Sequence, residues 1–276
     1  MSSPSTPAQL AELAASVAHV AGDVLLYHQR RLRSGADLSV ATKTSATDPV
    51  SMADQESEQA LVRAIEAARP DDGILGEEGA DRTGSSGLRW VVDPLDGTVN
   101  YLYGHIGWGV SVAVEQQADD GSWHGLAAAV FEPTTGIMHS AHRGGGATAN
   151  GRPLHVNDPV ELPMALVSTG FSYDRDHRLR QAALVSQVLG HVRDVRRVGS
   201  AALDLCRVAA GEVDAYFEDS TQRWDWAAGA LIAKEAGAVV TSLTTMPGHS
   251  GVVAAGPSLH PQLDALVGMS ADLPTA

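Results

Sequence analysis

Two aspartates and a proline follow an apolar run of the chain. Trp90-Val91-Val92 predicts a buried strand, and Asp93-Pro94-Leu95-Asp96-Gly97 continues directly from it. Proline fixes φ at roughly −65° and lacks an N–H donor, so we expect the chain to turn here and leave both carboxylates pointing into the same space. Two carboxylates so close repel each other unless a cation lies between them. With the Leu95 carbonyl, they offer the oxygen ligands that Mg²⁺ binds in proteins.

The residues after these acids offer a way to bind a phosphate without basic side chains. Gly97-Thr98 could begin a helix, and the free N–H groups at a helix start accept phosphate oxygens. This suits a chain with 19 basic and 33 acidic residues and a formal net charge of −14. The same pattern also fits an ordinary turn followed by a helix cap, so other acids must decide between the two.

Two further segments carry acids in positions that suit a metal site. Glu77 follows the apolar run Ile74-Leu75-Gly76 and lies between glycines, which leaves room for a metal and its waters. Asp225 lies between two tryptophans at the expected start of a helix, where an acid can cap the helix and also face a metal. Taken alone, each segment fits a solvated turn or a plain N-cap as well.

The elements that position these acids differ between the two halves of the chain. In the first half, apolar residues spaced three and four apart predict a helix from the N-cap Thr6 to before Gly35 and another from Ser51 to Arg69. Short β-like runs follow from Gly73. The last three predict an antiparallel meander over 108–114, 125–131 and 137–142. The glycines at 144–146 and 151 precede no helix pattern, so they predict tight turns rather than a phosphate cradle.

In the second half, strands and helices alternate. The expected strands are 165–168, 195–198, 214–217, 239–240 and 252–255, and the expected helices are 179–189, 201–210, 226–236 and 261–267. Such alternation indicates a layered α/β unit. We therefore expect an α/β protein with an α+β subdomain over residues 1–157, which holds the acidic loops and the meander, and an α/β subdomain over residues 158–276.

The bulk composition narrows the classes of function. The acidic balance argues against a nucleic-acid surface, because phosphate binding by side chains needs clustered Lys and Arg. The chain has no uninterrupted apolar run of about 18 residues, so no membrane span is expected. The single cysteine, Cys206, lies in an apolar run and is expected to be a buried thiol, which favours a reducing cytoplasm.

Three acidic segments together resemble signature elements of the inositol monophosphatase family. They are Gly76-Glu77-Glu78, Asp93-Pro94-Leu95-Asp96-Gly97-Thr98-Val99-Asn100 and Trp224-Asp225-Trp226-Ala227-Ala228-Gly229. They occur in the family order and at family-like separations. The resemblance extends to Lys43, to residues 48–54 and to Val198-Gly199-Ser200-Ala201-Ala202, and it covers nearly the whole chain, from Leu10 to Val267.

The resemblance implies a layered α-β-α-β-α sandwich of the sugar-phosphatase type and a magnesium-dependent attack of water on inositol monophosphate or a similar polyol phosphate. The implied ligands of the Mg²⁺ ions are Glu77, Asp93, the Leu95 carbonyl, Asp96 and Asp225. It also implies that the substrate is a small-molecule phosphate monoester, that the protein forms a homodimer and that lithium inhibits it.

The remaining implied roles belong to the reacting water, the phosphate and the polyol. Glu77, Asp54 and Thr98 would act in catalysis, with Asp54 and Thr98 orienting the water and helping to deprotonate it. The N–H groups of Gly97 and Thr98 would hold the phosphate. Glu218, seven residues before the acid of the Trp-Asp motif, would contact substrate hydroxyls. Ser200 and Ala201 would line the same polyol pocket.

Two departures from the family pattern leave the exact substrate open. Ser51 stands where the family often has threonine, and Asp219-Ser220 replaces a smaller turn, often with glycine, after Glu218. Related families hydrolyse histidinol phosphate, fructose 1,6-bisphosphate or adenosine 3′,5′-bisphosphate. Glu218 favours a hydroxyl-rich ligand instead, because a carboxylate repels a second phosphate.

Two other classes of protein are weaker alternatives. A haloacid-dehalogenase-type phosphatase places its acids two residues apart, on one face of a strand. Here Asp93 and Asp96 are three apart with a proline between them, which does not fit. A regulatory binding protein of the same fold is the other alternative, since bacterial relatives include members that associate with the transcription machinery. The intact set of acids argues that catalysis is retained.

Overall fold

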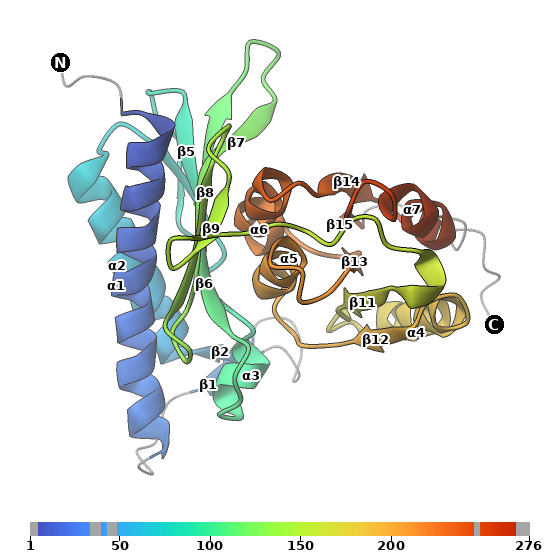
Figure 1. Cartoon of the computed structure of the whole chain (residues 1–276). Coiled ribbons are helices and arrows are strands. Elements are labelled where there is room, and N and C mark those ends of the chain that lie inside the picture. Colours follow the sequence, from blue (N-terminus) through green and yellow to red (C-terminus); the bar gives the residue numbers. More distant parts are fainter. Residues whose placement is uncertain (1–4, 34–39, 43–48, 246–248, 269–276) are drawn as a thin grey trace.

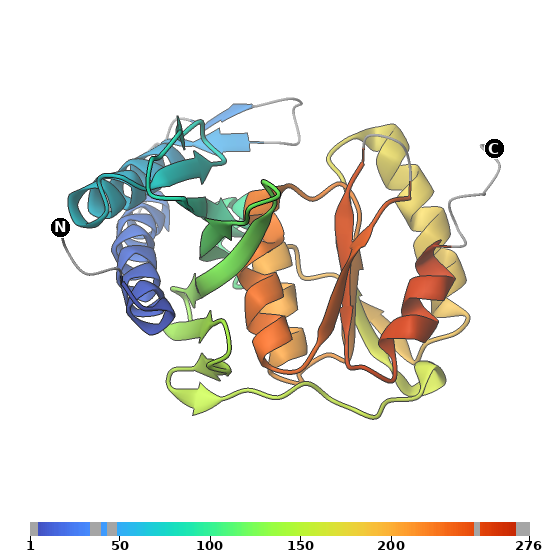
Figure 2. The ribbon, with the colours of Figure 1, turned by 90° about the horizontal axis from the view of Figure 1, so that it is seen from above.

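The computed structural model describes residues 5–33, 40–42, 49–245 and 249–268, and it contains five layers of secondary structure. Figure 1 shows the layers in order: a pair of helices, a large sheet, a second pair of helices, a smaller sheet and a third pair of helices. Figure 2 shows the same order from above. The structure therefore confirms the expected α/β class and the α-β-α-β-α layering.

Two helices cover the outer face of the large sheet. The first, α1 (Pro7–Arg33), begins with the expected capping box, in which the Thr6 N–H donates to Gln9 Oε1 over 2.9 Å and the Gln9 N–H donates to Thr6 Oγ1 over 3.3 Å. The second, α2 (Met52–Ala68), follows a short hairpin of β1 (Val40–Thr42) and β2 (Pro49–Ser51).

By length and composition alone, α1 is apolar enough to cross a membrane, and it is the only described helix of that kind. This differs from the expectation that the chain contains no such segment. In the fold, α1 uses its apolar stripe to cover the sheet, and Leu10, Val17 and Leu25 are each at most 2% exposed. Packing of this kind is typical of a core helix.

The large sheet has eight strands in the order β10-β9-β8-β7-β6-β5-β3-β4. Its strands are β3 (Gly73–Gly76), β4 (Asp81–Arg82), β5 (Leu88–Asp96), β6 (Gly109–Gln117), β7 (Trp123–Glu132), β8 (Ile137–His142), β9 (Ala147–Ala149) and β10 (Arg152–Pro153). Strands β6, β7 and β8 form the predicted antiparallel meander. The glycine segment at 144–146 is a turn whose Gly144 and Gly146 N–H groups both donate to Glu235, so it is no phosphate cradle.

The smaller sheet has the strand order β12-β11-β13-β15-β14. Its strands are β11 (Leu166–Thr169), β12 (Asp194–Arg196), β13 (Ala215–Glu218), β14 (Val239–Leu243) and β15 (Gly251–Ala255). The helices of this half are α4 (Arg175–Leu189), α5 (Ala201–Ala209), α6 (Arg223–Glu235) and α7 (His260–Gly268), with a 3₁₀ turn at Leu162–Met164. Strand β11 runs parallel to both β12 and β13.

Several predicted bounds were wrong by a few residues, among them the start of α6, which is Arg223 and not the expected residue 226. Helix α4 begins at Arg175, four residues before the expected start, because Asp174 caps it by accepting a hydrogen bond from the His177 N–H over 2.7 Å. Strand β12 ends at Arg196, before the expected Val198.

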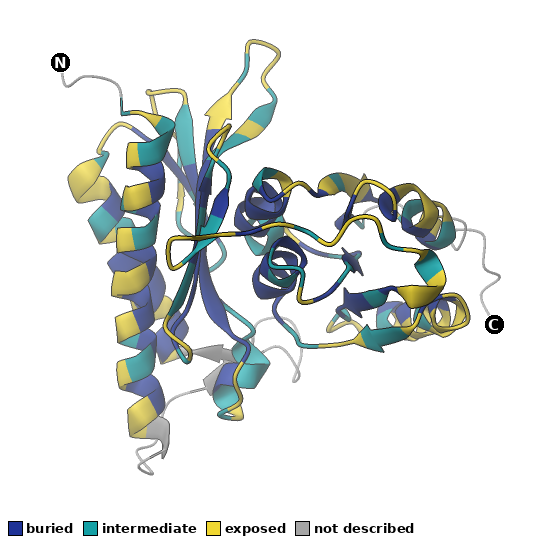
Figure 3. Ribbon diagram, in the orientation of Figure 1, coloured by how far each residue is buried: buried dark blue, intermediate teal, exposed yellow. Residues whose placement is uncertain are grey.

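Both faces of the large sheet are buried, so successive residues of a strand enter different cores. In β5, Trp90 and Val92 pack with α1 and α2, whereas Val91 joins the core that α5 and α6 form between the two sheets. Cys206 lies in this central core and is fully buried, as expected. A third core lies under α4 and α7. Figure 3 shows the buried residues concentrated at these layer boundaries.

Candidate active site

A cavity of about 490 Å³ opens where elements of both sheets end. All five expected metal ligands line it, together with Gly97, Thr98, Ala201 and Glu218. The remaining lining residues are Gly170, Phe171, Ser172, Tyr173, Asp174, Arg197, Gly199, Ser220, Thr221, Gln222 and Trp224. Residues from widely separated parts of the sequence therefore meet in one cavity.

Parallel pairing places Glu77 next to Asp93. Strand β3 runs parallel to β5 with Gly76 opposite Val92, and the two acids are the next residue on each strand. Their side chains therefore leave the same edge of the sheet. Glu58 on α2 supports the loop that carries Glu77, because its Oε1 accepts the Glu78 N–H over 2.9 Å.

The segment of Asp93 and Asp96 is a bulge in a continuing strand, not the expected turn. Strand β5 extends to Asp96, and its register with β6 shifts between Asp93 and Asp96. A bulge puts extra residues on one strand, so a proline can be accommodated without a lost ladder hydrogen bond. The Leu95 N–H donates to Asp93 Oδ1 over 2.8 Å, and the Ser57 hydroxyl donates to the Pro94 carbonyl over 3.1 Å. The bulge brings both acids to the cavity.

Asp96 is tied to the start of α5. Its Oδ2 accepts hydrogen bonds from the Ser200 hydroxyl over 2.7 Å and from the Ala202 N–H over 2.8 Å. Ser200 is the N-cap of α5 and is only 1% exposed, so its hydroxyl serves Asp96 and the helix start. Ser200 is thus not among the residues that line the cavity, unlike its neighbour Ala201.

Asp225 combines the two possible roles of an acid at a helix start. It is the third residue of α6, where its Oδ2 accepts the Gln222 N–H over 2.6 Å in a capping box, and it also lines the cavity. The Trp224 carbonyl accepts a hydrogen bond from the Ser111 hydroxyl of β6 over 3.1 Å. This bond fixes the start of α6 against the large sheet.

Burial and repulsion from neighbouring acids raise the pKa values of Asp93, Asp96 and Asp225. Burial is the main cause for Asp93, whose pKa lies well above the ordinary value, and the charges of Glu77, Asp96 and Asp225 raise it further. Burial also raises the pKa of Asp96 to about 7, although its hydrogen bonds act in the other direction. Burial and then the charge of Asp96 raise the pKa of Asp225. A cation in the cavity would oppose all of these shifts, because it favours the charged form of each acid.

The donor atoms of the cavity suit a hard cation. The expected metal ligands in its lining offer only oxygen atoms: four carboxylates and the Leu95 carbonyl. This carbonyl also accepts a hydrogen bond from the Thr98 hydroxyl over 3.1 Å. Mg²⁺ and Ca²⁺ prefer such oxygen ligands. In the described part of the chain, no three His, Cys, Asp or Glu side chains converge on a single point that could hold a metal ion. The fold thus gathers suitable ligands in one cavity without closing them around an ion.

Asp54 lies behind the cavity rather than in its lining. It is fully buried in the first turn of α2, and its charge is among the causes that raise the pKa of Asp93. Two other residues of the resemblance, Lys43 and Asp48, lie outside the described residues.

Gly97 holds a backbone conformation that other residues rarely adopt. It precedes the short helix α3 (Thr98–Leu102) with φ 94° and ψ 36°, and a Cβ there would lie 2.9 Å from the Gly107 carbonyl oxygen. We expect Gly97→Ala to lower the free energy of unfolding by about 2 kcal/mol, because a left-handed residue with a side chain is strained and the Cβ would press on backbone. Urea unfolding measures this change.

A second glycine, Gly121, separates the cost of backbone strain from the cost of the close contact with Gly107. Gly121 has φ 84°, but a Cβ there would meet no atom within 4 Å. Gly121→Ala should therefore lower the free energy of unfolding by less than Gly97→Ala does, because it adds backbone strain but no close contact. Equal losses in the two variants would mean that the close approach to Gly107 is unimportant.

The sequence indicated Glu218 in one wall of the cavity but not residues 170–174 of the same wall. Residues 170–174 follow β11, and Glu218 ends β13, which is the parallel neighbour of β11. Carboxyl ends of parallel strands meet at one sheet edge, so the strand pairing would have indicated this wall had it been known. Arg197 was also missed. It is the only Lys or Arg among the described lining residues, and no motif marks it.

Glu218 is held by two neighbours at this wall. The Tyr216 hydroxyl donates to its Oε2 over 2.8 Å, and a Cβ on Gly170 would overlap its carboxylate, so only glycine allows this approach. Burial raises the pKa of Glu218 to about 8, although the Tyr216 hydrogen bond and the charge of Arg197 lower it.

Comparison with known proteins agrees with this fold and site. The sequence model of the inositol monophosphatase family matches residues 7–269. An inositol-1-monophosphatase of Mycobacterium leprae is 47% identical over 234 residues, which are 80% of this chain and 78% of that protein. The Nus factor SuhB of Xylella fastidiosa is 41% identical over 224 residues, or 81% of this chain and 78% of that protein.

A solved structure extends the likeness to three dimensions. The crystal structure of the extragenic suppressor protein suhB from Bartonella henselae matches this fold with a TM-score of 0.82 at 32% identity, covering 93% of this chain and 97% of that one. Fold and site together define a layered α/β protein with an acidic cavity at its strand ends. The chain belongs to the inositol monophosphatase family, as its acidic motifs indicated.

Proposed function

We propose that this protein hydrolyses the phosphate monoester of inositol or a closely similar polyol in a magnesium-dependent reaction. The observation that carries the proposal is a group of four carboxylates, Glu77, Asp93, Asp96 and Asp225, which line one cavity, with Asp93 buried among them. Burial raises the pKa values of Asp93 and Asp225, and the charges of the neighbouring acids raise them further. The relative from Mycobacterium leprae bears the name inositol-1-monophosphatase.

The side chains of the large sheet and α6 would bind the metal. In the proposal, Glu77, Asp93, the Leu95 carbonyl, Asp96 and Asp225 hold Mg²⁺, which acts as a Lewis acid on the phosphate ester. The N–H groups of Gly97 and Thr98 bind a phosphate oxygen. Thr98 and Asp54, with Glu77, orient the attacking water and help to remove its proton.

The other wall of the cavity would bind the polyol. Glu218 and Ala201 both line it, and a carboxylate that accepts hydrogen bonds favours hydroxyl groups over a second phosphate. This supports an inositol monophosphate over a bisphosphate. Histidinol phosphate carries a cation instead of a ring of hydroxyls and is the first alternative for a substrate panel.

Phosphate release from inositol 1-phosphate, measured with and without Mg²⁺, tests the proposal. We expect turnover that requires Mg²⁺ and that falls when lithium is added, as the family resemblance implies. Undiminished turnover in lithium would contradict that inhibition while leaving a metal phosphatase intact. Absence of release from any phosphate monoester in Mg²⁺ would contradict the proposed function itself.

A binding role in transcription is the second candidate, because the Xylella relative is named a Nus factor. The relative at 47% identity is named inositol-1-monophosphatase, whereas the Nus factor of Xylella fastidiosa is 41% identical. This difference favours catalysis. An inactive protein in the phosphate-release assay would favour the binding role.

We also propose a cytoplasmic homodimer that binds neither nucleic acid nor membrane. The single, buried Cys206 suits a reducing compartment, and the formal net charge of −14 opposes contact with nucleic acid. Sedimentation of the purified protein tests the dimer.

A further inference from the structure

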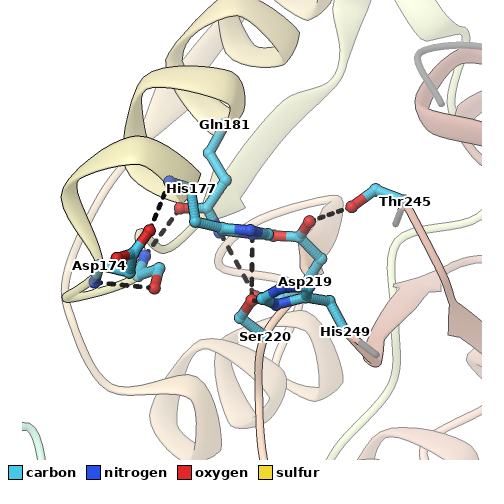
Figure 4. Close-up of polar contacts among 8 residues, drawn as sticks. Asp174, His177, Gln181, Asp219, Ser220, Thr245 and His249 are labelled. Atoms are coloured by element: carbon cyan, nitrogen blue, oxygen red, sulfur yellow. Dashed lines mark hydrogen bonds and ion pairs between the residues drawn. The ribbon is translucent and has the colours of Figure 1, made fainter. Parts of the chain in front are cut away.

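Figure 4 shows a network of polar side chains, outside the acidic motifs, around Asp219 and His177. Three segments contribute to it: the first turns of α4, the loop after β13 and the residues between β14 and β15. Its members are Asp174, His177, Gln181, Asp219, Ser220, Thr245 and His249. Asp174 and Ser220 also line the cavity. The network includes both residues of the Asp219-Ser220 departure from the family turn.

Asp219 is the buried centre of this network. It accepts hydrogen bonds from His177 Nε2 over 3.0 Å and from the side chains of Gln181 and Thr245. Burial acts to raise the pKa of Asp219, but these three hydrogen bonds outweigh it and hold the pKa below the ordinary value. Asp219 is therefore an anion that only accepts hydrogen bonds.

The charge on Asp219 fixes the proton of His177. Because a carboxylate cannot donate, His177 Nε2 must carry the hydrogen, and the same nitrogen lies 3.0 Å from Ser220 Oγ. His177 Nδ1 is buried and has no hydrogen-bond partner among the described residues. A nucleophilic triad needs its acid on one ring nitrogen and its serine on the other. Here Asp219 and Ser220 both contact Nε2 of His177, so Ser220 is not activated as a nucleophile.

The Ser220 hydroxyl contacts a second histidine, His249. The hydroxyl accepts from His177, and it lies 2.7 Å from His249 Nδ1, to which it can donate. The two histidine rings stack with their centroids 4.2 Å apart, which holds both nitrogens at the serine. A hydroxyl has one hydrogen and two lone pairs. In the tautomer of His249 whose Nδ1 carries no hydrogen, Ser220 donates to that nitrogen, and one lone pair of Ser220 Oγ remains to accept a hydrogen bond from a ligand.

Ser220 is in a strained backbone conformation. Its φ is 65°, and among the described residues only one other non-glycine residue, Asn150 with φ 47°, has a positive φ. Glycine adopts this conformation without strain, whereas a residue with a side chain does not. This strained residue carries a hydroxyl that contacts His177 and His249, and glycine would lack that hydroxyl.

Ser220 lines the cavity together with Glu218 and Asp174, two further groups that accept hydrogen bonds when ionised. We infer that Ser220 is a selectivity residue whose hydroxyl, oriented by His177 and His249, accepts a hydrogen bond from a hydroxyl group of the polyol end of the substrate. A second anionic group beside Ser220 has no hydrogen to donate, so it would not make this hydrogen bond. This inference rests on the proposed function and narrows its substrate class.

Ser220→Gly tests the inference without damage to the fold, because glycine relieves the strain at φ 65°. We expect the melting temperature to stay equal or rise. The ratio of kcat/KM for inositol 1-phosphate to kcat/KM for 4-nitrophenyl phosphate should fall about threefold to tenfold, the range for one lost hydrogen bond. Ser220→Ala should lower the ratio equally without the gain in stability. An unchanged ratio in both variants would overturn the inference.

Asn150→Gly is the matched control. It relieves the same kind of strain in the hairpin between β9 and β10, and Asn150 does not line the cavity. Its ratio of kcat/KM values should equal that of the wild type. A fall as large as that of Ser220→Gly would show that the ratio responds to stability and not to the lost hydroxyl, which would also overturn the inference.

Direct binding separates this inference from the proposed function. Ligand-observed NMR with myo-inositol in Mg²⁺ measures affinity without turnover, and Ser220→Gly should bind it more weakly than the wild type. If the wild type released phosphate from neither ester, the proposed function would fail, while weaker myo-inositol binding by the variant would still support the role of Ser220. Equal binding by the two proteins would refute that role.

Discussion

Asp93→Asn should abolish phosphate release while the protein remains folded. The substitution keeps the shape of a buried side chain at the bulge of β5 but removes its charge. If Asp93 binds Mg²⁺, the loss should reach at least about 10³-fold in kcat/KM, because a metal supplies several kcal/mol to the transition state and each 1.36 kcal/mol is worth tenfold.

The stability of the same variant gives a second, independent result. Without metal, Asp93→Asn should be as stable as the wild type or more stable, because a neutral amide replaces a carboxylate that Glu77, Asp96 and Asp225 repel. Mg²⁺ should raise the melting temperature of the wild type, since a ligand of the native state stabilises it, and the variant should show a smaller rise.

Asp23→Asn is the control for this pair of measurements. Asp23 is 67% exposed on α1 and contacts only His19 in the described ion pairs. It should keep wild-type activity and the wild-type response to Mg²⁺. If Asp93→Asn kept activity within about tenfold of the wild type, the assignment of Asp93 as a metal ligand would be wrong.

The acidic half of the site could be predicted from the sequence because each acid directly follows an apolar strand or begins a helix. Glu77 directly follows β3, and Asp93 occupies the adjacent position on the parallel strand β5, so the pairing of the two strands brings the acids together. The shape of the Asp93-Pro94 segment could not be predicted. A proline after a strand indicates a turn, but the pairing of β5 with β6 continues past it as a bulge, and only the partner strand decides that.

The polyol wall was less predictable because its residues become neighbours only through long-range pairing. Residues 170–174 carry no motif, and the parallel pairing of β11 with β13 places them beside Glu218. Ser200 was predicted to line the polyol pocket but does not line the cavity. It lies in a motif of the resemblance, yet its hydroxyl caps α5 and binds Asp96. Ser220 was visible only as a departure from the family turn, since its positive φ needs coordinates.

Glu218→Gln should separate the choice of substrate from the chemistry. Glutamine keeps the shape of the side chain beside Tyr216 and Gly170 but weakens a charge-assisted hydrogen bond to substrate hydroxyls, which contributes roughly 1.5–3 kcal/mol. We therefore expect kcat/KM for inositol 1-phosphate to fall by about tenfold to a hundredfold. The loss should largely vanish with 4-nitrophenyl phosphate, which lacks those hydroxyls.

The pH dependence of this selectivity adds a sharper test. Burial raises the pKa of Glu218 to about 8, so the carboxylate form is present above that value and is lost as the pH falls below it. The wild-type ratio of kcat/KM for the two esters should therefore rise as the pH increases toward 8 and beyond, because the protonation of the reacting phosphate is common to both substrates and cancels. In Glu218→Gln the ratio should not change with pH.

Glu212→Gln is the control, because Glu212 is an exposed acid shortly before β13. It should match the wild type on both esters at every pH. Equal losses on inositol 1-phosphate and 4-nitrophenyl phosphate in Glu218→Gln would show that Glu218 serves the metal site or the fold, since those are shared by both reactions. A loss confined to the inositol ester, with a ratio that no longer depends on pH, would place the Glu218 carboxylate against the hydroxyl groups of the substrate.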